Sequence, residues 1–93
     1  MTPPDLPLGY YRHFKGAIYR VAGLARDCET QVWTVYYQCC YGDWSYWLRP
    51  YTVFCEQVLQ GGQMQPRFQF IGVDAPGDLA PVPVGASEAE RGV

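Results

Sequence analysis

Apolar and polar residues alternate along short stretches of this chain, which is the pattern of β-strands rather than of helices. The clearest stretch is "VWTVYYQCCY" at residues 32–41, which is rich in β-branched and aromatic side chains. Successive side chains of a strand point to opposite faces. The odd-numbered residues 35–41 are therefore predicted to face a core, and Tyr36 and Gln38 to face outward.

Similar patterns predict the rest of the fold. The predicted strands cover residues 10–15, 17–26, 32–41, 45–50 and 66–72. Gly23 is a candidate β-bulge, and "YGDW" turns the chain so that residues 32–50 form a hairpin that Pro50 ends. Residues 51–59 are interpreted as one or two helical turns, and 60–65 as a loop. The pattern predicts a mostly β fold of about five strands with one short helical element. Closure into a small β-barrel would remove the exposed edges of such a sheet.

The aromatic residues mark the limits of the folded unit. All fifteen lie between Tyr10 and Phe70, whereas the chain beyond Gly72 consists mainly of Pro, Gly, Ala and acidic residues. Such a segment buries too little apolar surface to offset its ordering entropy. We therefore predict a flexible N-terminal arm at 1–9, a barrel domain at 10–72 and a disordered acidic tail at 73–93.

Charge excludes one class of function. The whole chain has a formal net charge of −2, but residues 10–72 hold six basic and four acidic side chains, a net charge of +2. This is too mild for a sequence-independent nucleic-acid binder. The chain shows no secretory signal pattern, so we expect a cytoplasmic protein whose four cysteines are reduced.

Several of these stretches together match a known family. They are Tyr11–Gly16, Tyr19–Val21, Ala25–Arg26, Glu29–Thr30, Val35–Gln38, Tyr41–Asp43, Trp47, Arg49–Pro50, Phe54 and Pro66–Phe68. On these residues, the chain resembles over positions 11–72 the bacterial family called domain of unknown function 1653. The resemblance implies a small SH3-type β-barrel and carries over no catalytic residue. Cys39 and Cys40 depart from the small or aliphatic residues expected there, so it implies no thiol chemistry.

The cysteines and the single histidine do not form a metal-binding pattern. Structural zinc requires three or four Cys or His ligands, usually as closely spaced pairs. Cys39 and Cys40 are adjacent and on a strand point to opposite faces, while Cys28 and Cys55 are isolated. We expect no metal and no cofactor, and we interpret the cysteines as small hydrophobic side chains.

Catalysis has weaker support than binding. A nucleophile needs a neighbouring base, and His13 is the only histidine. Glu29 and Glu56 are the plausible acid/base carboxylates. A small enzyme that uses His13 with Glu29 or a cysteine therefore stays as a second alternative, and no catalytic residue is assigned.

An aromatic surface is the stronger hypothesis, because a small barrel cannot bury fifteen aromatic side chains. Exposed Tyr and Trp beside Arg is the composition of a binding hot spot. The candidate ligand-binding residues are Arg49, Trp47, Trp44, Tyr46, Tyr36, His13, Lys15 and Glu29. We expect Trp44 and at least one of Tyr46 and Trp47 to be partly exposed near Arg49. The structural alternative is that Arg49 only pairs with Glu29 or Glu56.

The class of partner is less well determined. An aromatic groove with few charges suits a protein or peptide, and the acidic tail would repel phosphate. We therefore predict a non-catalytic binding module for a protein or peptide. The first alternative is a binder of a nucleotide or single-stranded RNA, through stacking and Arg. The sequence does not determine the oligomeric state.

Overall fold

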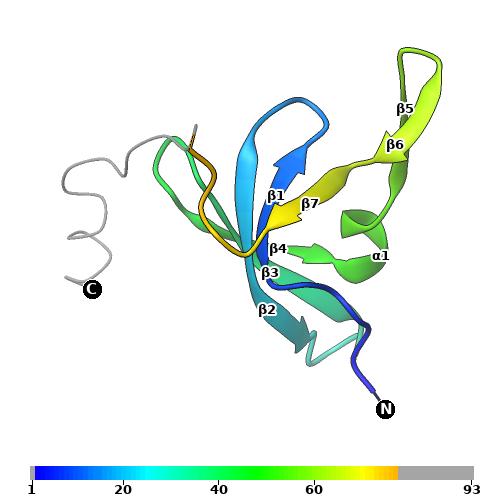
Figure 1. The fold of residues 1–93 in the computed structure, drawn as a ribbon. Helices are drawn as coiled ribbons and strands as arrows, with labels where there is room; N and C mark the ends of the chain where they lie inside the picture. Colours follow the sequence, from blue (N-terminus) through cyan, green and yellow to red (C-terminus); the bar gives the residue numbers. More distant parts are fainter. Residues whose placement is uncertain (1, 78–93) are drawn as a thin grey trace.

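The computed structural model describes residues 2–77, and these form a small β domain. Its elements are β1 (Gly9–His13), β2 (Ile18–Arg26), β3 (Trp33–Cys39), β4 (Tyr46–Pro50), α1 (Tyr51–Phe54), β5 (Gln57–Gln60), β6 (Gln63–Pro66) and β7 (Phe68–Gly72). Five strands form an antiparallel sheet in the order β4-β3-β2-β1-β7, and β5 and β6 form a separate hairpin (Figure 1). The prediction of a mostly β fold with five main strands and one short helix is confirmed. The predicted disorder of the tail falls largely on residues 78–93, which lie outside the described part.

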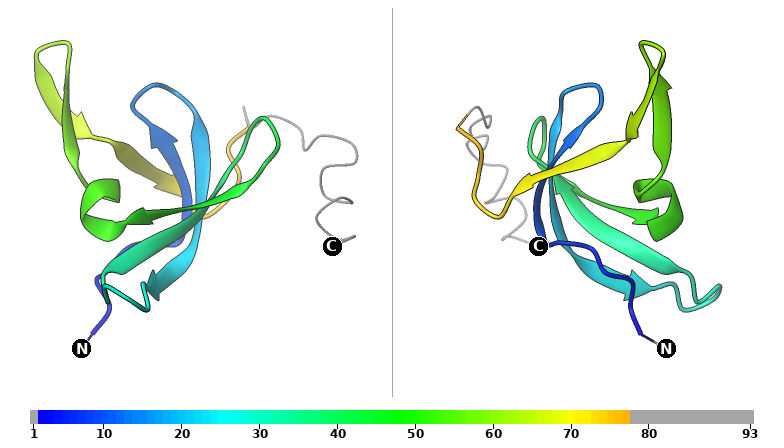
Figure 2. Two further views of the ribbon diagram at one scale, coloured as in Figure 1. Left: turned by 180° about the vertical axis from the view of Figure 1, so that it is seen from behind. Right: turned by 45° about the vertical axis from the view of Figure 1, so that its right-hand side comes forward.

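The sheet bends strongly, and the bend gives the domain its barrel shape (Figure 2). The register between β2 and β3 shifts between Val21 and Gly23, which confirms the predicted bulge. A bulge adds local twist and allows a long strand to wrap around a core. Together with α1, which contacts β3 and β4, the bent sheet forms a small SH3-type barrel. The predicted closure that would remove the edges is not observed, because the outer strands β4 and β7 do not pair with each other. Among the described residues, no helix is long and apolar enough to cross a membrane.

The core consists mainly of aromatic and β-branched side chains from several strands. Its buried members are Tyr11, Val21, Val35, Tyr37, Phe54 and Phe68. The inward face predicted for β3 is confirmed at Val35, Tyr37 and Cys39. It is wrong at Tyr41, which is exposed. The physical reason is that β3 ends at Cys39, so the alternation of side chains does not continue to residue 41.

The hairpin of β5 and β6 replaces the loop expected at 60–65, and helix α1 ends at Phe54 instead of continuing toward residue 59. Gly61 and Gly62 both have positive φ, as a two-residue type I′ turn requires. Leu59 and Met64 are exposed, so this hairpin lacks the buried alternation by which a strand is detected in a sequence. The Gly-Gly pair was the signal that could have revealed it.

The N-terminal segment lies against the barrel without regular secondary structure. The Tyr11 hydroxyl donates to the carbonyl oxygen of Pro7 at 2.7 Å, and Leu6 packs against the core. The predicted flexibility of residues 1–9 stays a prediction, and these are the contacts that such motion would break.

Candidate ligand-binding face

The ring of Phe68, at the start of β7, is the centre of a cluster of aromatic and basic side chains. Phe54 stacks on this ring with 4.2 Å between centroids and 2° between planes. That contact leaves the other side of the ring for Arg49, whose guanidinium carbon lies 5.7 Å from the Phe68 centroid. The rings of His13 and Tyr19 meet Phe68 at steep angles, with centroids 4.9 and 5.3 Å away. We call Arg49, Phe68, Tyr37, His13, Tyr19 and Trp47 the aromatic face.

The pairing of β3 with β4 positions Arg49 and Trp47. Arg49 lies opposite Val35 and Trp47 opposite Tyr37, so both project to the same side of the sheet as the core. Because β4 is the outer strand of the sheet, neither is fully covered. Trp47 is 56% exposed, and Arg49 is half-buried. The Arg49 Nε–H donates to the Tyr37 hydroxyl at 3.1 Å.

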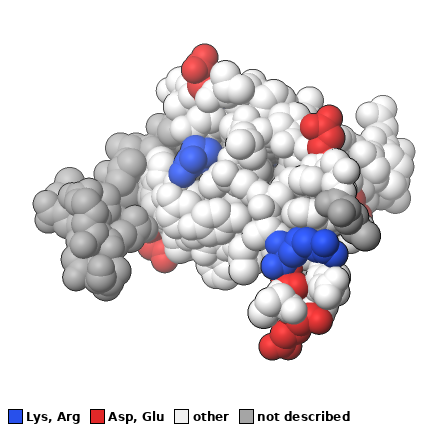
Figure 3. All heavy atoms as spheres, turned by 90° about the horizontal axis from the view of Figure 1, so that it is seen from below, with Lys and Arg blue, Asp and Glu red and all other residues white. Residues whose placement is uncertain are grey.

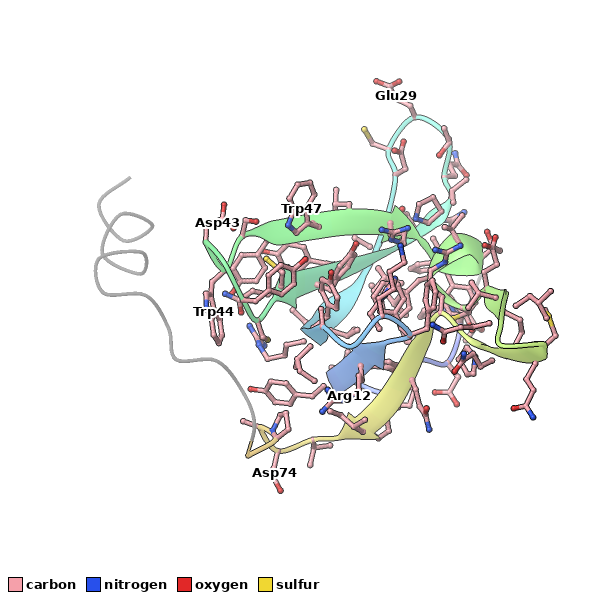
Figure 4. The ribbon with its side chains drawn as sticks, turned by 90° about the horizontal axis from the view of Figure 1, so that it is seen from above. Arg12, Glu29, Asp43, Trp44, Trp47 and Asp74 are labelled. Atoms are coloured by element: carbon pink, nitrogen blue, oxygen red, sulfur yellow. The ribbon has the colours of Figure 1, made fainter. Side chains whose placement is uncertain are left out.

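Arg49 has no carboxylate partner among the described residues. Glu56 pairs with Arg67 instead. Glu29 lies at the tip of the β2–β3 loop and projects away from the sheet (Figure 4). The structural alternative, in which Arg49 pairs with one of these two glutamates, is therefore not observed, and its Nη1 and Nη2 groups have no hydrogen-bond partner in residues 2–77.

His13 ends β1, and its ring contacts that of Phe68. Its Nδ1 accepts the backbone N–H of Lys15 at 3.1 Å, so the neutral ring carries its proton on Nε2. Burial lowers the pKa of His13, and the positive charges of Arg67, Arg49 and Lys15 lower it further. His13 is thus a neutral donor at pH 7 within a locally positive region.

The structure brings together only some of the predicted site residues. Arg49, Trp47 and His13 share the aromatic face, and the ammonium group of Lys15 lies nearby, 5.7 Å from the Phe14 ring centroid. Tyr46 and Tyr36 occupy the opposite side of the sheet, where their rings stack at 5.1 Å. These two tyrosines form an exposed pair, but they lie on a different surface from Arg49.

The expectation that Trp44 is exposed is wrong. Trp44 is only 8% exposed and packs with Ile18 and Cys40. Gly42 and Trp44 both have positive φ, so the β3–β4 turn directs the indole back onto the sheet. Trp44 and Trp47 project to opposite sides of the ribbon in Figure 4.

Phe68, Tyr37 and Tyr19 are members of this face that sequence reasoning did not select. Their alternation marked them as ordinary strand residues, and nothing local distinguishes them. They meet Arg49 only because the bend of the sheet brings β7 and β2 near β4. No group of three or more His, Cys, Asp or Glu residues within 2–77 could hold a metal ion. The absence of a metal from the native protein stays a prediction.

A small SH3-type barrel whose outer strand carries an exposed Trp47 and a half-buried Arg49 beside a buried aromatic cluster is the class of protein that this geometry defines. The chain belongs to the family described as "Protein of unknown function (DUF1653)", whose model matches residues 9–70. It is similar to the crystal structure of a DUF1653 protein from Bordetella bronchiseptica, with 36% sequence identity and a TM-score of 0.71. That match covers 77% of this chain and 95% of the other. The search of curated proteins found no match.

Proposed function

We propose that this domain is a non-catalytic binding module whose aromatic face engages an extended segment of a protein partner. One observation carries the proposal: Arg49 and Trp47 lie on β4, which pairs only with β3 among the described strands. An exposed indole and a half-buried guanidinium thus lie on an edge strand whose outward backbone N–H and C=O groups can pair with a peptide. Peptides commonly bind such edges by adding a strand.

The register shows which backbone groups face the open edge. The Cys39 N–H donates to the Ser45 carbonyl at 3.0 Å, so residues 39 and 45 form a hydrogen-bonded pair. Such pairs alternate along an antiparallel ladder. Trp47 and Arg49 therefore bond to β3, whereas the N–H and C=O groups of Tyr46 and Leu48 point outward. An added strand would place alternate side chains on the same side as Trp47 and Arg49.

The distribution of charge favours a protein over RNA. The domain is only mildly basic, with six basic and four acidic side chains in residues 10–72, and the few charges on the side seen in Figure 3 form no continuous basic track. RNA binding would call for a continuous basic track along the phosphates. The predicted nucleotide or RNA ligand remains the alternative outcome of the experiment below.

The enzyme alternative that pairs His13 with Glu29 gains no support from the positions of these two residues. His13 is the last residue of β1, beside the β1–β2 turn, and Glu29 lies in the β2–β3 turn, so they are at opposite ends of β2, which spans nine residues. A strand of that length separates its ends by about 25 Å. A proton transfer shared by these two side chains is not possible over such a distance.

Amide NMR of the labelled full-length chain tests the proposal. A library of extended peptides is expected to shift the resonances of β4, Tyr37 and His13, and Trp47→Ala is expected to abolish the effect. Leu59→Ala is the matched control, because Leu59 is also exposed but lies on the β5–β6 hairpin. Saturable binding of short RNAs without any response to peptides would overturn the proposal, as would peptide shifts that survive Trp47→Ala.

A further inference from the structure

We infer that the aromatic face recognises a carboxylate, which Arg49 binds through its two Nη groups. The inference rests on the proposed function only for the source of the carboxylate, namely an extended peptide. The acidic group can be a Glu or Asp side chain or the C-terminal carboxylate of the partner, because the chemistry is the same.

The guanidinium of Arg49 is held in one orientation with its outer groups available. Its Nε–H is used by the Tyr37 hydroxyl, and the Phe68 ring lies on one side of it. These two contacts fix the plane of the fork, while Nη1 and Nη2 have no hydrogen-bond partner among the described residues. An arginine fork fixed in this way suits the planar, two-oxygen geometry of a carboxylate.

The local balance of charge favours a monoanion. Arg67 is compensated by Glu56 in an ion pair. Arg49 has a neutral phenol as its partner, so it contributes one uncompensated positive charge. The same charge is one of the causes that lower the pKa of His13, after burial and Arg67, so the guanidinium lies close enough to interact with the His13 ring. The Lys15 ammonium also lies nearby but over the Phe14 ring, so Arg49 is the one cation among the described residues placed against Phe68, which suits a single negative charge better than a phosphate dianion.

His13 supplies a second donor on the same ring of Phe68. Its Nδ1 accepts the backbone N–H of Lys15, and its Nε2–H has no hydrogen-bond partner among residues 2–77. The His13 and Arg49 side chains both contact Phe68. A carboxylate bound by the guanidinium therefore has a neutral donor close by, and exposed Trp47 offers an apolar surface to the group that bears it.

Benzoate and benzamide are the first probes, because they have nearly the same shape and differ in charge. We expect benzoate to produce saturable shifts of the Arg49 Nε–H and His13 ring resonances in the full chain, with binding about tenfold tighter than benzamide. Equal effects of the two compounds would overturn the inference. So would inorganic phosphate that binds the same residues more tightly than benzoate.

Two variants locate the effect. Arg49→Lys keeps the charge but not the fork, and we expect it to weaken benzoate binding by about tenfold. Arg20→Lys is the matched control, since Arg20 bonds to Gln38 and Tyr46 on the other side of the sheet. Unchanged benzoate binding by Arg49→Lys would overturn the inference. The wild-type titrations decide the question even if this variant fails to fold.

Three peptides separate the sources of the carboxylate and the two proposals. They are acetyl-Leu-Val-Glu-Val-Leu-amide, the same peptide with Gln in place of Glu, and the Gln peptide with a free C-terminal acid. Tighter binding of the first identifies a side chain, and tighter binding of the third a chain terminus. Equal binding of all three overturns the carboxylate inference and leaves the binding module intact. Binding of benzoate without binding of any peptide would keep the carboxylate inference and overturn the proposed binding module.

Discussion

The Nε–H of Arg49 donates to the hydroxyl of Tyr37 at 3.1 Å, across the pair of strands that form one edge of the sheet. Tyr37 is buried in the core, whereas Arg49 is half-buried at the edge. The hydrogen bond therefore joins the packed interior to the candidate ligand-binding face. It gives Arg49 a moderate structural role in addition to any role in recognition.

Arg49→Ala is expected to destabilise the domain by about 1–2 kcal/mol, because it removes one hydrogen bond and one cation–π contact. The variant should stay folded and lose ligand binding. Urea unfolding followed by Trp fluorescence measures the stability, and amide NMR shows whether the fold is retained. Complete loss of the folded state would mean that Arg49 serves structure alone.

Trp44→Ala and Trp47→Ala should differ sharply in stability. Truncation of the buried Trp44 is expected to lower the free energy of unfolding by about 3–5 kcal/mol, as for other large core side chains. Trp47 is 56% exposed, and its truncation should change the free energy of unfolding by less than about 1 kcal/mol. Thermal melts of the two variants make the comparison. Equal melting temperatures would contradict the burial assigned to Trp44.

Acidification should destabilise the domain through His13. Its pKa is lowered in the folded state, by burial first and then by Arg67, Arg49 and Lys15, so the unfolded chain binds the proton more readily. The contribution of His13 is therefore fully present above its unfolded pKa of 6.5 and is lost as the pH falls through the lower folded value.

The measurement for His13 is the free energy of unfolding between pH 7.5 and about 5, where carboxylates are still mostly ionised. His13→Gln should flatten the profile in this window, because His13 is the only histidine of the chain. An NMR titration of the ring gives the folded pKa directly. A value above 6.5 would contradict the environment described for this residue.

The four thiols should react with a thiol reagent in a definite order. Cys28 is exposed and should react first. Cys55 is also exposed, but burial raises its pKa despite a hydrogen bond from Tyr51, and it should follow. Buried Cys39 and Cys40 should react only on unfolding. Thiol counting with Ellman's reagent is expected to give two accessible groups natively and four after denaturation under argon.

Gly9→Ala should be more destabilising than Gly23→Ala. Gly9 has a φ of +139°, and a Cβ there would lie 2.6 Å from the carbonyl oxygen of Gly72 on the neighbouring strand. We expect a cost of about 1–3 kcal/mol from strain and displacement of β7. A Cβ at Gly23 would meet no heavy atom within 4 Å, which makes it the control. Equal stability of the two variants in urea would contradict the close approach of β1 and β7.

Local pattern was sufficient for most of the strands. The alternation around Val35 and Tyr37 placed β3 and its inward face correctly, and Gly23 marked the bulge, because both signals depend only on neighbours in the chain. The hairpin of β5 and β6 was missed for the same reason. Its side chains are largely exposed on both faces, so burial left no alternation there to detect.

The sequence by itself determined the size of the folded unit, its β class, its family and the aromatic and arginine side chains available for a surface. The tertiary structure decided which of these aromatic and arginine side chains contact one another. Arg49 and His13 were selected from composition, but their common contact with Phe68 depends on a bend that brings the first, second, fourth and seventh strands together. Trp44 was misplaced because a positive φ in a turn reverses the direction of its side chain. Alternation is a property of neighbouring residues, whereas a site is made by residues distant in the chain, and only packing of the whole sheet fixes those contacts.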